Sequence, residues 1–190
     1  MTLVIGLGNP DSKYKYNRHN VGFMVIDRLV DDHTTTKINK SSFKGELFKS
    51  ANILFLKPQT YMNLSGDSVR AVCDYYKPER IIVIHDDLDL PFGTLRYKIG
   101  GGHGGHNGLR SIDSHIGKDY YRVRIGIGKP NNKQDVANFV LSDFPKSDED
   151  NLKKIIDVSV EATKKLVKEE LNVVSSLFTL KNNFKEKKES

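Results

Sequence analysis

The sequence predicts an α/β fold, a single domain whose mixed and largely parallel sheet is flanked by helices. Short apolar runs alternate along the chain with stretches whose apolar residues recur at helical spacing. One run, residues 81–84 (IIVI), is apolar throughout, which is typical of a central strand covered on both faces. The length of 190 residues suits one domain, and the chain contains no internal repeat, low-complexity block or interdomain linker.

Strands are expected where apolar residues form short runs or alternate with polar ones. The first run ends in a Gly-Asn-Pro turn, and Pro58 closes another. Leu95, Tyr97 and Ile99 share one face of a later strand. The expected strands are residues 2–7, 43–50, 52–57, 81–84, 94–99 and 121–127.

Helices are expected where apolar residues recur every three or four positions. Such spacing occurs over residues 20–32, from about Ser65 onward, and over 109–116. A long C-terminal helix is expected to bury a face that includes Leu152, Ile155, Ile156, Ser159, Ala162 and Leu166. Residues 147–150 (SDED), which precede it, have the form of a capping box.

The composition is that of an ordinary globular protein, with 37% hydrophobic and 28% charged residues. No stretch is long and apolar enough for a membrane span, and the N-terminus lacks the features of a signal peptide, so we expect a cytoplasmic protein. Cys73 is the single cysteine, which excludes an internal disulfide and a cysteine-rich zinc site. We expect residues 1–180 to form the domain and 181–190 to form a charged, flexible tail.

The net charge of +6 and the isoelectric point near 9.2 indicate an anionic partner. The last ten residues hold four lysines and two glutamates, which leaves a charge of +4 on the rest of the chain. The basic excess therefore belongs largely to the folded body.

Three polar segments follow expected strands, at residues 8–19, 57–63 and 85–89. Ligands of open α/β sheets bind beyond the carboxyl ends of the strands, so these segments are candidates for one binding site. A dinucleotide fingerprint after the first strand is not supported, because Asp11 replaces its third glycine. The glycine-rich residues 100–107 lack the Lys-Ser/Thr end of a phosphate-binding Walker loop.

Residues 85–89 (HDDLD), with His103 and His106, raise the alternative of a divalent metal site. Their spacing matches neither a calcium loop nor a zinc motif. A single carboxylate at Asp86 that orients an imidazole is a rival interpretation, because a base histidine needs its tautomer fixed. His19 taken alone is more typical of a helix entry than of a catalyst.

Amide and tyrosine side chains that are candidates for ligand contacts occur in these segments. Asn9, Asn63 and Asn107 each lie in an expected turn, and side-chain amides can hold a peptide backbone or a water without adding charge. Tyr14 and Tyr16 are candidates for stacking on an unpaired base, with a place at the core edge as the alternative.

Four blocks of sequence combine these residues. They are residues 6–22, which begin GLGNP and end RHNVG, residues 57–66 (KPQTYMNLSG), residues 85–91 (HDDLDLP) and residues 100–108 (GGGHGGHNG). In this order they resemble the bacterial type of peptidyl-tRNA hydrolase, over about residues 3–180. The resemblance implies a single α/β domain with a twisted mixed sheet, usually monomeric, without a metal or other cofactor.

The resemblance also implies roles for individual residues. His19 matches the general base of the family, and Asp86 matches the carboxylate that orients it. Asn9 matches the residue that distinguishes blocked from free aminoacyl-tRNA. Asn63 and Asn107 match residues that hold the substrate and the attacking water.

Further positions match contacts to the tRNA. Tyr14 and Tyr61 match residues that contact the 3′ CCA end, and Lys98 and Arg124 match a clamp on the 5′-phosphate of the acceptor stem. Departures from the family pattern are Asp11 in place of glycine, Asn17 in place of threonine and Phe92 in place of proline. These departures concern loop conformation and none falls on a matched catalytic position.

The activity that follows is hydrolysis of the ester between the peptide and the 3′-terminal ribose of peptidyl-tRNA, by a water that a histidine activates. A non-catalytic RNA-binding module on the same fold is the alternative from another class. A metal-dependent hydrolase is the third possibility.

Overall fold

The computed structural model describes residues 1–181 and contains a mixed seven-stranded sheet, so the expected fold class is confirmed. The strand order is β2-β3-β4-β1-β5-β7-β6. The four central strands, β4, β1, β5 and β7, run parallel, while β3 and β6 pair antiparallel with their neighbours. The strands are β1 (Thr2–Gly6), β2 (Thr36–Lys37), β3 (Gly45–Ser50), β4 (Ile53–Pro58), β5 (Arg80–Asp87), β6 (Leu95–Ile99) and β7 (Tyr121–Gly126).

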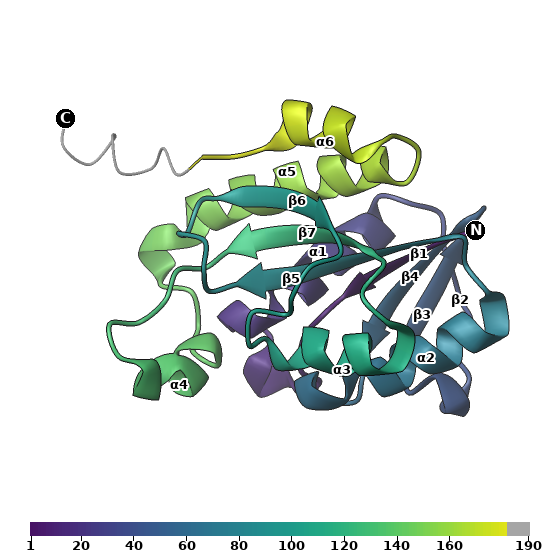
Figure 1. Ribbon diagram of the computed structural model, residues 1–190, viewed down its shortest axis with the longest axis horizontal. Coiled ribbons are helices and arrows are strands. Elements are labelled where there is room, and N and C mark those ends of the chain that lie inside the picture. Colours follow the sequence, from purple (N-terminus) through teal and green to yellow (C-terminus); the bar gives the residue numbers. More distant parts are fainter. Residues whose placement is uncertain (182–190) are drawn as a thin grey trace.

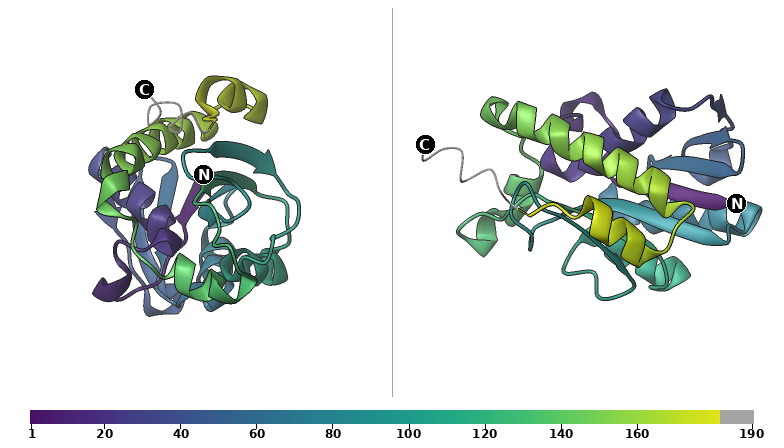
Figure 2. Two further views of the ribbon diagram at one scale, coloured as in Figure 1. Left: turned by 90° about the vertical axis from the view of Figure 1, so that its left-hand side faces the viewer. Right: turned by 90° about the horizontal axis from the view of Figure 1, so that it is seen from above.

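Helices cover both faces of the sheet (Figures 1 and 2). On one side α1 packs against β1 and α5, and α6 packs against α5 and β6; on the other side α2 packs against α3. The short α4 lies beyond the carboxyl ends of β5 and β7, at the left of Figure 1. The helices are α1 (Val21–Asp31), α2 (Ser65–Tyr76), α3 (Asn107–Ile116), α4 (Val136–Val140), α5 (Glu149–Leu166) and α6 (Leu171–Phe178).

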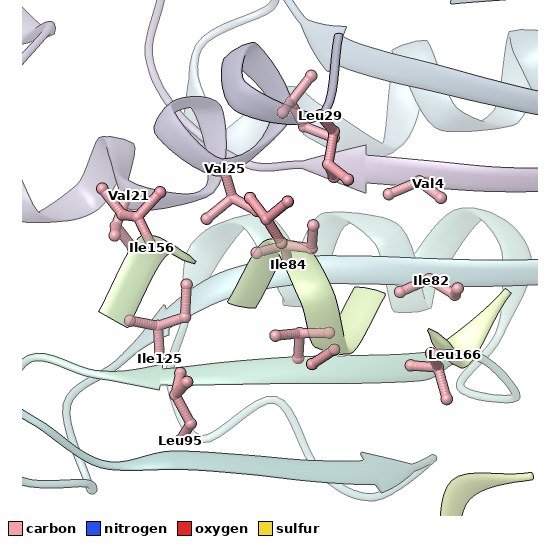
Figure 3. Packing of buried hydrophobic residues seen from close by; sticks show 14 of the residues in the cluster. Val4, Val21, Val25, Leu29, Ile82, Ile84, Leu95, Ile125, Ile156 and Leu166 are labelled. Carbon is pink, nitrogen blue, oxygen red and sulfur yellow. The ribbon is translucent and has the colours of Figure 1, made fainter. Parts of the chain in front are cut away.

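Two apolar clusters, one on each face, hold these layers together. Alternate residues of each strand point to opposite faces, so Val4 joins the cluster under α1 and α5, while Leu3 and Ile5 join the one under α2 and α3. Figure 3 shows the first cluster, in which Val25 of α1 and Ile84 of β5 come together. Because both faces are covered, the central strands are apolar on both sides, as residues 81–84 predicted.

The N-terminus of α1 lies unusually close to the sheet. A Cβ atom on Gly22 would stand 2.5 Å from the carbonyl oxygen of Ile84 and 2.6 Å from the backbone nitrogen of Leu7. Only glycine allows this approach, because both neighbours are backbone atoms that cannot turn aside. The residues just before α1 are thereby held at the carboxyl ends of β1 and β5.

Several expectations from sequence need correction. The strand expected from residue 43 begins at Gly45, since Phe43 lies in a 3-10 turn, and the strand expected over 81–84 continues to Asp87. The expected capping box is wrong, because Asp148 is the N-cap of α5 and no side chain caps that helix. The elements β2, α4 and α6 were not expected.

The remaining expectations concern the chain ends and the membrane. The expected tail lies outside the described residues except for Lys181. No helix among the described residues is long and apolar enough to span a membrane.

Candidate active site

The three polar segments meet at the carboxyl edge of the central strands. Asn9 follows β1, Met62 follows β4, and Asp86 lies near the end of β5. The Asn9 side-chain oxygen accepts a hydrogen bond from the Met62 backbone nitrogen at 2.8 Å. His19 reaches Asp86 from the turn before α1. Parallel strands in the order β4-β1-β5 therefore assemble one site from distant segments.

A buried carboxylate lies between two histidines at the centre of this site. Nδ1 of His19 is 2.7 Å from Oδ2 of Asp86, and Nε2 of His106 is 2.8 Å from Oδ1 of the same carboxylate. The Asp86 side chain is 2% exposed, whereas those of His19 and His106 are 11% and 10% exposed. Both oxygens of Asp86 are thus satisfied, one by each ring.

The surrounding hydrogen bonds assign the tautomers of these rings. Nδ1 of His106 accepts from the backbone nitrogens of Gly108 and Leu109, so His106 is the N-cap of α3 and its proton is on Nε2. His19 donates its Nδ1 proton to Asp86, and its Nε2 makes no hydrogen bond to residues 1–181, so it can accept a proton. A neutral His19 of this tautomer can take a proton from a water.

Charge and burial oppose each other at Asp86. Burial raises the pKa of the Asp86 carboxyl, but the charges and hydrogen bonds of His19 and His106 outweigh it and hold the pKa well below its usual range. Asp86 is therefore ionised at neutral pH and can stabilise an imidazolium at His19.

His85, beside this carboxylate, is kept neutral. Its Nδ1 donates to the Asp86 backbone oxygen at 2.8 Å, and its side chain is buried. Burial, together with repulsion from His106, lowers the pKa of His85 to about 4. The histidine with an accessible free nitrogen beside Asp86 is therefore His19.

Asn9 is fixed by a reciprocal pair of hydrogen bonds with Asn20. The Asn9 backbone nitrogen donates to the Asn20 side-chain oxygen at 2.8 Å, and the Asn20 amide donates back to the Asn9 carbonyl at 3.0 Å. With its Oδ1 held by Met62, Asn9 keeps one group, the Nδ2 amide, that makes no hydrogen bond within residues 1–181. Asn9 is thus a fixed donor of neutral charge.

A pocket of about 370 Å³ opens beside His19. Its walls include the predicted residues His19, Asp86, Lys98, Asn107 and Arg124, and segments of α4 and the glycine-rich loop. Burial and the nearby charges of Arg124 and Arg122 lower the pKa of Lys98. Arg124 donates through Nε to Asp87 at 2.9 Å.

The other predicted residues lie outside this pocket lining. Asn9 borders a second hollow of about 590 Å³ together with Tyr16 and Asn20. Tyr61 is 48% exposed and donates its hydroxyl proton to Asp11 at 2.8 Å. Asn63 is exposed on the turn after β4, next to α3, and Tyr14 is half-buried under the Lys13 ammonium group.

The structure shows how two residues that depart from the family pattern, Asp11 and Asn17, are accommodated. Asp11 has a φ of 84°, in the region that favours glycine, so the loop keeps a glycine-like conformation at a cost of about 1–3 kcal/mol. Asn17 is buried and donates to Asp143 at 2.7 Å. Tyr61 also has a positive φ, of 65°.

Two residues of this site were missed from sequence. His106 was considered only as a metal ligand, and its role as a cap had no sequence signal, because the helix was expected from residue 109 and histidine is not a favoured N-cap residue. Arg122 is buried on β7 and donates to the carbonyl oxygens of Gly102 and Gly101 at 2.6 and 2.9 Å. Arg122 therefore anchors the glycine-rich loop at Gly101 and Gly102.

The donor set of His19, Asp86 and His106 also meets the loose geometry of a metal site, with ligand atoms within 4.8 Å of one another. The facing nitrogens and oxygens are at hydrogen-bond distances, and the His106 tautomer places a proton between its Nε2 and Asp86. A metal ion would have to displace both protons. We interpret the cluster as a hydrogen-bonded chain.

Comparison with known proteins identifies the class as an ester hydrolase. A sequence profile described as peptidyl-tRNA hydrolase matches residues 3–189. A curated peptidyl-tRNA hydrolase from Aliarcobacter butzleri is 59% identical over 95% of this chain and 100% of its own length, and one from Sulfurovum is 56% identical over 96% and 97%.

Solved structures agree with this result. The crystal structure of peptidyl-tRNA hydrolase from Acinetobacter baumannii superposes with a TM-score of 0.87 at 40% identity, covering 93% of each chain. Its Arg119Gln mutant gives a TM-score of 0.88 at 38% identity, covering 94% of each chain. The chain belongs to the peptidyl-tRNA hydrolase family, so the family predicted from sequence is confirmed and the non-catalytic alternative is not favoured.

The environment of His85 predicts a loss of stability in mild acid. The pKa of this histidine is about 4 in the folded protein and about 6.5 in an unfolded chain, so the unfolded state binds more protons between these values. The stability from neutral His85 is complete above pH of about 6.5 and is lost as pH falls toward 4, by at most on the order of 3 kcal/mol.

Urea unfolding between pH 7 and 4.5 measures this effect. His85→Asn keeps an N–H group for the Asp86 carbonyl and does not titrate, so its stability should fall less with pH than that of the wild type. Parallel curves for the two proteins would contradict the prediction.

Proposed function

We propose that this chain hydrolyses the ester between the peptide and the 3′-terminal ribose of peptidyl-tRNA and releases free tRNA, with His19 as the general base. The observation that carries the proposal is the pair of hydrogen bonds that hold His19 and His106 on Asp86. This arrangement leaves Nε2 of His19 free beside a pocket of about 370 Å³. Binding of RNA alone would need no oriented base.

The reaction requires no nucleophilic side chain. Nε2 of His19 takes a proton from a water about 3 Å away as the water attacks the ester carbonyl carbon. Asp86 stabilises the imidazolium that forms, and the amide of Asn9 or Asn63 donates to the developing oxyanion. The proton then passes from His19 to the departing ribose oxygen, which restores the neutral base.

The free amide of Asn9 accounts for selectivity in this proposal. A peptidyl group offers a neutral amide whose carbonyl can accept from Asn9 Nδ2, whereas a free aminoacyl group carries an ammonium that cannot. A substrate that leaves a polar group of the site unpaired is disfavoured. Asn107, at the start of α3 and in the pocket lining, is proposed to hold the attacking water.

The tRNA is proposed to lie across the cationic side of the pocket. Lys98 and Arg124 on the adjacent strands β6 and β7 would clamp the 5′-phosphate of the acceptor stem. The terminal nitrogens of Arg124 make no hydrogen bond in the described part of the chain, so they remain available for a phosphate. Tyr14 and Tyr61 would contact the 3′ CCA end.

Other features follow from the same proposal. The protein would act as a monomer in the cytoplasm, where its substrate is made. The hydrogen-bonded chain around Asp86 favours this mechanism over metal-dependent hydrolysis, in which a metal-bound water would be the nucleophile.

Removal of the base is the first test. His19→Ala should lower kcat for N-acetyl-aminoacyl-tRNA by roughly 10²–10⁴-fold and leave KM nearly unchanged, since the ring activates water. His33→Ala, at the other end of α1, is the matched control and should keep full activity. Near-normal turnover by His19→Ala, or loss of wild-type activity in a chelator, would contradict the mechanism.

The proposed role of Asn9 is tested by measuring how well the enzyme distinguishes blocked from free aminoacyl-tRNA. Asn9→Asp keeps an oxygen for the Met62 backbone nitrogen and replaces the amide donor by a negative charge. The ratio of kcat/KM for N-acetyl-aminoacyl-tRNA to that for free aminoacyl-tRNA should fall by at least about tenfold, the equivalent of one lost hydrogen bond. An unchanged ratio in a folded variant would remove Asn9 from substrate selection.

The phosphate clamp is tested by charge reversal. Lys98→Glu or Arg124→Glu should raise KM, spare kcat and reduce the slope of log KM against log salt by about one. Lys37→Glu makes the same change of charge on β2, at the opposite edge of the sheet, and should have a much smaller effect. A KM equal to that of the control at low salt would exclude the residue from the tRNA path.

A further inference from the structure

Arg18 makes an extensive set of contacts to a segment more than a hundred residues away. Its NH1 nitrogen donates to the Ser142 hydroxyl at 2.6 Å, the Ser142 carbonyl at 3.3 Å and the Asp143 carbonyl at 3.0 Å. The guanidinium group also lies over the Phe139 ring, 4.2 Å from its centroid. A planar, permanently charged group can make both kinds of contact at once.

The backbone on either side of Arg18 makes further bonds to the same segment. The Arg18 backbone nitrogen donates to the Ser142 carbonyl, and the Phe144 nitrogen donates to the Tyr16 carbonyl. Asn17, which is buried, donates from its side chain to Asp143. The turn before α1 and the residues after α4 are therefore joined by hydrogen bonds at several positions.

The residues just before them, in and around α4, form part of the wall of the His19 pocket. Within the segment 133–144, the residues that line the pocket are Lys133, Gln134, Val136, Ala137 and Val140. Most of the segment is exposed, and only Val140 is buried, so apolar burial holds it weakly. The contacts with Arg18 and Asn17 therefore attach the segment to the turn that carries His19, together with the packing of Phe144 on Phe92.

Arg18 and His19 are consecutive residues of one 3-10 turn, residues Arg18–Asn20. Arg18 binds the residues after α4, His19 binds β5, and Asn20 binds the loop after β1. The same short turn thus carries the proposed base and binds the segment that contributes to the pocket wall. Because Arg18 and His19 are adjacent in the chain, they set the distance between the base and this wall.

We propose that Arg18 is a positioning residue for hydrolysis, which holds residues 133–144 as the substrate-contacting wall of the His19 pocket. The inference rests on the proposed function, in which this pocket receives the 3′ end of peptidyl-tRNA. Arg18 does not line the pocket, and its effect on the substrate is transmitted through Phe139 and Ser142.

Replacement of Arg18 tests the proposal. Arg18→Ala should raise KM for N-acetyl-aminoacyl-tRNA by about tenfold, because a stacked and hydrogen-bonded arginine contributes about that factor. The kcat should change by less than about threefold, since His19 keeps its bond to Asp86. Hydrogen exchange should accelerate in residues 133–144 and remain unchanged in β1 and β5.

Arg28→Ala is the matched control, because it removes one positive charge at a surface pair with Asp157 away from the His19 pocket. Phe139→Leu removes the stacking partner and leaves the turn of His19 and the hydrogen bonds of Arg18 intact, so it should raise KM by the part of the tenfold that stacking supplies, even where Arg18→Ala folds poorly. The double variant should be about as impaired as Arg18→Ala alone, because that change already removes the stacking on Phe139.

Three outcomes are informative. Faster exchange in residues 133–144 with a tenfold rise in KM supports the proposal. Unchanged exchange, or faster exchange with KM equal to that of Arg28→Ala, overturns it. Failure of the wild type to hydrolyse N-acetyl-aminoacyl-tRNA would instead reject the proposed function, while the exchange measurement would still show whether Arg18 holds the segment.

Discussion

The site depends on one buried carboxylate. A charge as enclosed as that of Asp86 is tolerated only when both oxygens find donors, and here two histidine rings supply them. Each ring is fixed by this requirement. His106 is also the cap of α3, so the carboxylate links β5, the glycine-rich loop and the turn before α1 into one arrangement.

The turn Arg18–Asn20 connects this carboxylate to the other elements of the site. Its three side chains each bind a different element, so the base cannot shift without disturbing the loop after β1 or the segment after α4. Gly22 completes the arrangement, because it lets α1 approach the backbone of β1 and β5. Lys98 and Arg124 also line the pocket, and their positive charge suits an anionic substrate.

The fold was largely predictable because buried faces leave periodic patterns in the sequence. Residues 81–84 and the buried face of α5 were recognised in this way. Two other features leave no such pattern. β5 continues through the polar His85 and Asp86 because their backbone pairs with β7, and α6 is a helix of eight residues that buries only Val174 completely.

The sequence alone determined the family, the order of the strands and helices other than β2, α4 and α6, and the polar segments that follow β1, β4 and β5. The family resemblance already paired Asp86 with His19, but only the tertiary structure decided the geometry of that pair and which other side chains meet. His19 and Asp86 are separated by 67 residues, and Arg18 and Ser142 by 124, so no local pattern records these pairs. Their hydrogen bonds depend on strand order and on the close approach of α1, which arise when the whole chain packs.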